Sequence, residues 1–132
     1  MKEENTKKYL IDASFLLSYL LPDEESDTVI DFMAEHNREP FLLFAPVILY
    51  FEISNAIKSA VVSHRITKDQ AHDLLRGVKK LNIKILEVDY EDVLDIALES
   101  QISFYDASYV ALSQQLHVPL LTLDEKLKKI KN

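Results

Sequence analysis

The sequence predicts an α/β fold in which a central parallel sheet of four to five strands is flanked by helices on both sides. Short apolar runs alternate along the chain with longer segments whose apolar residues recur at helical spacing, which is typical of this class. The 132 residues amount to one domain, and 48% of them are apolar, which is enough to bury a core. No linker, repeat or low-complexity stretch interrupts them. We therefore expect a single domain over residues 1–132.

In the first half of the chain, apolar runs too short for a helix mark the strands, and apolar residues at helical intervals mark the helices. Asp12 separates the first strand from its helix, and Pro46 ends the second strand because proline has no N–H to donate. Residues 41–57 carry one charge, Glu52, and are shorter than the span of about 20 apolar residues that crosses a membrane. We expect no membrane insertion there. The expected elements are strands over residues 9–11 and 41–45 and helices from residue 13, over 24–36 and over 47–63.

In the second half, Thr67 and Gln70 form a capping box that begins a helix, and Asn82 ends it. The chain's one glycine, Gly77, lies inside this helix, where it costs about 1 kcal/mol relative to alanine. We therefore expect another helix to pack closely against Gly77. The remaining expected elements are a strand over residues 84–88, helices over 91–100 and 103–116, a strand over 119–123 and a helix over 125–130.

Composition excludes several kinds of chemistry. A single glycine excludes the glycine-rich phosphate loops of dinucleotide-binding proteins and P-loop enzymes, and the absence of cysteine excludes disulfides, thiolate metal sites and cysteine nucleophiles. The polar start of the chain shows no signal peptide, so we expect a cytoplasmic protein. The histidines stand apart from the acidic motifs, and we expect them on the surface or in loops. They are His36, His64, His72 and His117.

The net charge of -7 is unevenly distributed. Residues 85–125 contain nine acidic residues and no basic one, whereas residues 58–84 contain seven basic and two acidic residues. Basic segments beside an acidic centre can hold a polyanion such as RNA, although an ordinary solvated helix face is the alternative for each residue. The candidates are Lys58, Arg65, Lys68, Arg76, Lys79, Lys80 and Lys126.

Four carboxylates occupy positions that a parallel sheet would bring together. Asp12 follows the first strand and Asp124 the fourth, and the carboxyl ends of parallel strands meet at one edge. Asp106 and Glu52 lie early in helices that begin near the same edge. Each has a structural alternative: Asp12 and Asp124 are N-cap candidates, and Asp106 fits a capping arrangement with Ser103. Glu52 fits a tertiary salt bridge or a position at the edge of a cleft. No basic residue stands three or four positions from Glu52 to neutralise it locally.

Oxygen ligands without cysteine or histidine suit a hard cation, Mg²⁺ or Mn²⁺. Without the ion, the four carboxylates would repel one another and raise their own pKa values. Such a site needs no nucleophile from the protein and suits the attack of water on a phosphodiester. Beside Asp106, Tyr105 and Tyr109 are candidates for stacking on a base, with core packing as the alternative.

Four segments, covering residues 9–14, 51–56, 103–112 and 119–127, resemble the PIN-domain ribonucleases in order and spacing, and most of all the VapC-type toxins of toxin–antitoxin pairs. Each motif alone is weak, but together they are specific and cover nearly the whole chain. The resemblance implies cleavage of RNA with Mg²⁺ or Mn²⁺, a homodimer, and inhibition by a small antitoxin. The residues at the family's functional positions are Asp12, Glu52, Asp106 and Asp124 as metal ligands, Ser14 and Thr122 as hydroxyls beside them, and Asn55 in a structural or supporting role.

Other classes of function fit the sequence less well. A catalytically silent PIN-like module that binds RNA or a protein has no need to maintain four mutually repelling acids. A phosphatase of the haloacid type needs a D-x-D motif, and Ser14 occupies the position of the second acid. A solitary housekeeping nuclease is the alternative to a toxin if no antitoxin accompanies the chain.

Overall fold

A computed structural model describes residues 6–130. Within this range, four parallel strands form one sheet in the order β3-β2-β1-β4, which confirms the expected fold class. Leu10 of β1 pairs with Phe44 on one side and with Leu120 on the other. The strands are β1 (Lys8–Ile11), β2 (Leu42–Pro46), β3 (Lys84–Leu86) and β4 (Leu120–Leu121).

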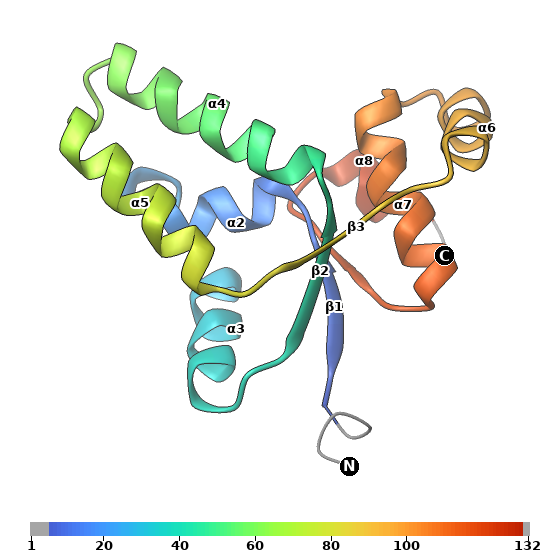
Figure 1. Cartoon of the computed structure of the whole chain (residues 1–132), viewed down its shortest axis with the longest axis horizontal. Coiled ribbons are helices and arrows are strands. Elements are labelled where there is room, and N and C mark those ends of the chain that lie inside the picture. Colours follow the sequence, from blue (N-terminus) through green and yellow to red (C-terminus); the bar gives the residue numbers. More distant parts are fainter. Residues whose placement is uncertain (1–5, 131–132) are drawn as a thin grey trace.

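Helices cover both faces of this sheet (Figure 1). Helices α2 to α5 lie on one side, and α6, α7 and α8 lie on the other. Each expected strand and helix is present, with its ends displaced by up to three residues. The helices are α2 (Ala13–Leu20), α3 (Asp27–Arg38), α4 (Ile48–Val62), α5 (Lys68–Lys80), α6 (Tyr90–Ser100), α7 (Phe104–Leu116) and α8 (Glu125–Lys128), with a 3-10 turn η1 at Pro22–Glu24.

The core lies where β1 and β2 meet the helices. Leu10 and Ile11 of β1 are fully buried, as are Leu49 and Ile53 of α4. A smaller cluster, which includes Val93 of α6, joins that helix to α7. No helix within residues 6–130 combines the length and the apolar character that a membrane span requires.

Side-chain caps and left-handed residues set the ends of the helices. The capping box of Thr67 and Gln70 begins α5 as expected, with both hydrogen bonds formed. Asn82, which we expected to end this helix, has a positive φ of 54°. His64, Gln101 and His117 also adopt positive φ after helices, positions at which glycine is the usual residue.

Two local expectations were wrong. A Cβ at Gly77 would meet no atom within 4 Å, so no helix among the described residues packs closely against this position. His36 is 8% exposed rather than on the surface, because it lies three residues after Met33 and seven after Val29, on the buried side of α3. Its Nδ1 accepts a hydrogen bond from the Phe41 N–H at 3.0 Å. His64, His72 and His117 are exposed as expected.

Candidate active site

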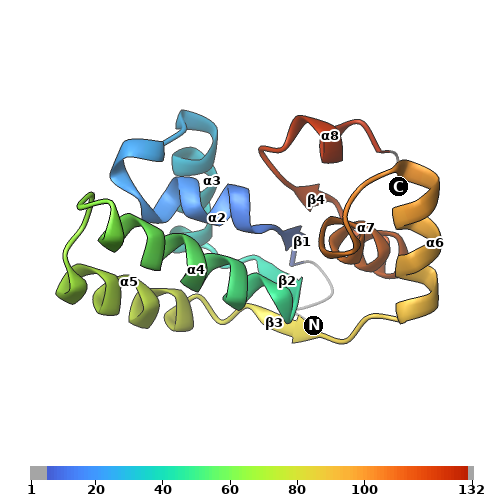
Figure 2. The ribbon, with the colours of Figure 1, turned by 90° about the horizontal axis from the view of Figure 1, so that it is seen from above.

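The carboxyl edge of the sheet contains the point where the strand order reverses. After β1 the chain adds β2 and β3 on one side, and it then returns to add β4 on the other side. Asp12 directly follows β1, and Asp124 lies three residues beyond β4. Figure 2 shows that α2, α4 and α7 begin around the end of β1. In open α/β sheets, ligands bind at such switch points.

Asp12 is held in place by three donors. Its Oδ1 accepts hydrogen bonds from the Ser14 hydroxyl at 2.8 Å and the Phe15 N–H at 3.0 Å, and its Oδ2 accepts one from the Thr122 hydroxyl. The bond from Phe15 makes Asp12 the N-cap of α2, so the structural alternative is also realised. Asp12 is buried, and this burial is the main cause that raises the pKa of its carboxyl above the ordinary value.

Ser14 and Thr122 connect the two strand ends on either side of the switch point. The Ser14 hydroxyl oxygen accepts a hydrogen bond from the Leu123 N–H at 2.9 Å, and the Thr122 hydroxyl oxygen accepts one from the Asp124 N–H at 3.0 Å. Both hydroxyls also donate to Asp12. The structure therefore brings the two expected hydroxyl residues to the first aspartate.

Glu52 is half-buried in the second turn of α4 and has an unexpected partner. The Tyr109 hydroxyl donates a hydrogen bond to Glu52 Oε1 at 2.6 Å. No Lys or Arg among residues 6–130 forms an ion pair with Glu52, so the salt-bridge alternative is wrong for the described chain. Burial, followed by the charges of Asp106 and Asp12, raises the pKa of its carboxyl.

Tyr109 is the functional candidate whose role the sequence reasoning missed. Its side chain is 1% exposed, which confirms the core-packing alternative, but its hydroxyl reaches Glu52. A signal was available, because Tyr109 stands three residues after Asp106 and therefore on the same side of the helix. Tyr105 is 58% exposed, so core packing was the wrong alternative for this residue.

Asp106 and Asp124 complete the set. The Ser103 hydroxyl accepts a hydrogen bond from the Asp106 N–H at 3.0 Å, so the expected capping arrangement is present. Burial, followed by the charge of Asp124, raises the pKa of the Asp106 carboxyl, while Lys126 opposes the shift. Asp124 Oδ1 accepts hydrogen bonds from the N–H groups of Lys126 and Leu127 and caps α8.

Electrostatic interactions connect all four carboxylates. Asp12 interacts with Asp106, Glu52 interacts with both, and Asp106 interacts with Asp124. As they stand, no three His, Asp or Glu side chains among residues 6–130 are close enough together to hold one ion. The oxygen donors and their mutual repulsion fit Mg²⁺ or Mn²⁺, and binding would require these side chains to move closer together.

The basic candidates are dispersed. Lys126 lies near Asp106, whereas Arg65 forms ion pairs with Asp23 at 2.8 Å and Glu24 at 2.7 Å, between the α4–α5 loop and η1. Arg76 pairs with Asp73 at 2.9 Å on α5. Arg76 and Lys79 line a hollow between α4 and α5 that Glu52 does not border. The other basic candidates are exposed along α4 and α5, and they are Lys58, Lys68 and Lys80. Asn55, expected in a structural or supporting role, is also exposed on α4.

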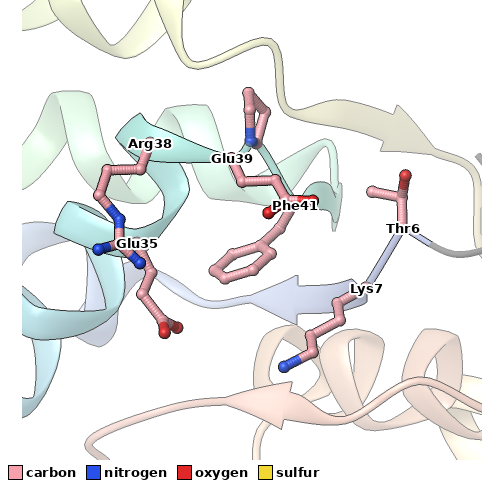
Figure 3. A pocket seen from close by; sticks show the side chains of 7 residues that line it. Thr6, Lys7, Glu35, Arg38, Glu39 and Phe41 are labelled. Carbon is pink, nitrogen blue, oxygen red and sulfur yellow. The ribbon is translucent and has the colours of Figure 1, made fainter. Parts of the chain in front are cut away.

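A pocket of about 170 Å³ lies at the opposite edge of the sheet (Figure 3). Lys7 precedes β1 and Phe41 precedes β2, so this pocket borders the amino ends of the strands. It shares no residue with the carboxylate site. Its lining residues are Thr6, Lys7, Glu35, Arg38, Glu39, Pro40 and Phe41.

Known proteins resemble this chain in sequence. Ribonuclease VapC1 of Mycobacterium tuberculosis is 34% identical over 90 residues, and the match covers 63% of this chain and 63% of that relative. The chain thus spans under two thirds of that protein's length. Ribonuclease VapC3 of Pyrobaculum aerophilum is 26% identical over 124 residues, which cover 91% of this chain and 92% of the relative.

Solved structures share its fold. The crystal structure of PAE2754 from Pyrobaculum aerophilum has a TM-score of 0.73 and 25% identity, covering 92% of this chain and 77% of that one. VapC20 of Mycobacterium tuberculosis, described as a toxin that cleaves the sarcin-ricin loop, has a TM-score of 0.67 and 13% identity, covering 91% and 92%. Residues 9–132 match the PIN domain. This match covers nearly the whole chain, and the chain therefore belongs to the PIN domain family.

Proposed function

We propose that this chain is an endoribonuclease that hydrolyses RNA phosphodiester bonds with Mg²⁺ or Mn²⁺ held by Asp12, Glu52, Asp106 and Asp124. The observation that supports the proposal most strongly is the electrostatic coupling of these four carboxylates at the switch point without an ion pair to any of them among residues 6–130. Burial without a neutralising partner is costly, and a divalent cation relieves it. When bound, such an ion activates water and offsets charge on the phosphate and the leaving oxygen.

The protein's own contribution is to position the ligands. Three donors fix both oxygens of Asp12, and Tyr109 fixes one oxygen of Glu52, so these two carboxylates are oriented before the side chains close around an ion. Near Asp106, Lys126 supplies a positive charge that can attract a phosphate group. Among residues 6–130, Lys126 is the basic residue whose charge lowers the pKa of a carboxylate in the candidate site, that of Asp106.

A cleavage assay on mixed RNA tests the proposal. Wild-type protein should cut RNA with Mg²⁺ or Mn²⁺ and stop when a chelator is added. Asp12→Asn and Asp106→Asn should each lose at least about 100-fold in rate, because oxyanion ligands of the ion are removed. Asp31→Asn, an exposed acid on α3, is the matched control and should retain full activity. Cleavage that survives both substitutions and chelation would contradict the mechanism.

We further propose that the chain is the toxin of a type II toxin–antitoxin pair, acting as a homodimer and inhibited by a small antitoxin protein. Relatives named VapC ribonucleases support this role. Leu94 and Leu98, one turn apart on α6, are 49% and 69% exposed and offer an apolar surface for a protein contact.

Expression in a bacterial host tests the toxin role separately. Induction should arrest growth, and co-expression of a small gene adjacent to the toxin gene should relieve the arrest. The Asp106→Asn protein, expressed at the same level, should not arrest growth. If no neighbouring gene relieves the arrest, a solitary nuclease becomes the better interpretation.

A further inference from the structure

Three aromatic side chains stand exposed beside the carboxylates, and the proposed chemistry uses none of them. Phe51 is 68% exposed, Phe104 is 38% exposed and Tyr105 is 58% exposed. We call these three residues the aromatic rim. Folded proteins normally bury rings of this size, so their exposure in one region calls for a ligand or a partner.

The rim is continuous with the candidate active site. Phe51 immediately precedes Glu52 on α4, and Tyr105 immediately precedes Asp106 on α7. Successive helical residues are about 100° apart, so each ring projects next to its carboxylate without pointing in the same direction. Helices α4 and α7 begin on either side of the end of β1 (Figures 1 and 2). The rings therefore occur on both helices that flank the carboxylates.

The charges around Phe104 and Tyr105 favour bases over phosphates as the contact of these two rings. Residues 85–125, which include Phe104 and Tyr105, contain no basic residue, and this stretch alone carries nine acids. A phosphate group finds no cation there, whereas the face of a nucleobase stacks on an aromatic ring without one. The cation near Asp106, Lys126, lies on α8 and is positioned to attract the backbone instead.

We propose that the aromatic rim stacks the bases on either side of the scissile phosphate and so positions the RNA strand over the carboxylates. This inference rests on the proposed ribonuclease function and adds the residues that hold the bases. Paired bases are already stacked within their own helix and leave no face free for the rim. Each stacked base contributes a free energy that corresponds to roughly tenfold in binding.

The chain contains no tryptophan, so a single introduced tryptophan reports on its own surroundings. We would measure the fluorescence of Phe51→Trp and Tyr105→Trp, each in an Asp12→Asn background that preserves the RNA, while adding an unstructured oligonucleotide. Val62→Trp is the matched control, because Val62 is 67% exposed on the same face of α4, about three turns from Phe51. RNA binding is followed in parallel by the anisotropy of a labelled oligonucleotide.

Stacking should quench the two rim tryptophans by about half or more, leave Val62→Trp unchanged, and give no quenching with the same sequence as a duplex. In the active enzyme, Phe51→Leu and Tyr105→Leu should each raise KM by about tenfold with kcat retained, whereas Tyr105→Phe should behave as wild type. Equal quenching at all three positions, or RNA binding without rim quenching, overturns the proposal.

Two further outcomes separate the alternatives. If a second copy covers the rim, the rim tryptophans shift to shorter wavelength as protein concentration rises and do not respond to RNA, which overturns the proposal while cleavage persists. If anisotropy detects no RNA binding and the wild type cuts no RNA, the ribonuclease function itself fails, and the role of the rim fails with it.

Discussion

The hydrogen bond between Tyr109 and Glu52 is the contact in the site most amenable to a single substitution. Tyr109→Phe removes only the hydroxyl, which donates at 2.6 Å and lowers the pKa of Glu52. We expect the affinity for Mn²⁺ to fall by about 10- to 100-fold, since a ligand that loses its supporting hydrogen bond binds the ion less well. Calorimetric titration with Mn²⁺ measures this effect.

The variant should also need a higher pH to bind Mn²⁺, because the carboxyl pKa rises further when the hydroxyl is lost. Tyr50→Phe is the matched control, since Tyr50 is a half-buried residue of α4 that borders the hollow toward α5. An affinity for Mn²⁺ that is equal in Tyr109→Phe and wild type would show that Glu52 does not depend on this bond.

At the scale of elements, α5 carries a glycine that its surroundings do not require. Gly77 has helical φ, and a Cβ would enter open space. Gly77→Ala should raise the free energy of unfolding by about 1 kcal/mol, because alanine loses less backbone entropy in a helix. Urea denaturation followed by circular dichroism measures it. Gly77→Val should gain less, since a β-branched side chain is restricted in a helix. No gain with alanine would mean that another molecule occupies this side of α5.

The junction of α3 and β2 depends on a neutral histidine. Burial lowers the pKa of His36 below its ordinary value of 6.5, and Nδ1 must remain unprotonated to accept from Phe41 N–H. The unfolded chain therefore binds the proton more readily, and stability should fall as pH drops below about 6.5 and level off below the pKa of the folded state. Melting temperatures at pH 7.5, 6.5 and 5.5 measure the slope.

His36→Gln isolates this effect, because an amide oxygen can accept the same hydrogen bond and does not titrate. The difference in melting temperature between wild type and variant should change across this pH range. His72→Gln alters an exposed imidazole on α5 and should leave the slope unchanged. A pH-independent difference for His36→Gln would contradict the assignment.

At the scale of the whole molecule, we expect the four carboxylates to couple metal binding to stability. The pKa values of Asp12, Glu52 and Asp106 are raised in the folded state, so the folded protein binds more protons than the unfolded chain between pH about 4 and these raised pKa values. In chelator, the contribution of these groups to stability should therefore decrease as pH rises through that window. Mg²⁺ prefers the ionised form and should reverse the trend.

Thermal melts at several pH values, with Mg²⁺ and with chelator, measure this coupling. At one hundred times its dissociation constant, an ion that binds only the folded state adds about 2.7 kcal/mol. Asp106→Asn should respond less to Mg²⁺ because one ligand and one repelling charge are removed. If Mg²⁺ leaves the melting temperature of wild type unchanged at pH 7.5, the carboxylates do not form a metal site.

Much of the fold could be predicted because it depends on local signals. Capping side chains such as Thr67, the stop at Asn82 and the short apolar runs act within one helical turn or one strand, so they can be read directly from the sequence. His36 was misplaced because the expectation rested on residue type, whereas its helical spacing from Val29 and Met33 places it on the buried side of α3.

The candidate site, like the fold, could be predicted from the sequence only in part. The types and spacing of the four acids determine an all-oxygen donor set and its placement at one sheet edge, because strand ends of a parallel sheet share a side. The tertiary structure alone decided the partners of these acids: Thr122 meets Asp12 across 110 residues and Tyr109 meets Glu52 across 57. It also decided that Tyr109 is buried while Tyr105, on the same helix, is exposed. Contacts this distant in sequence depend on how the layers pack, and no local pattern records that packing.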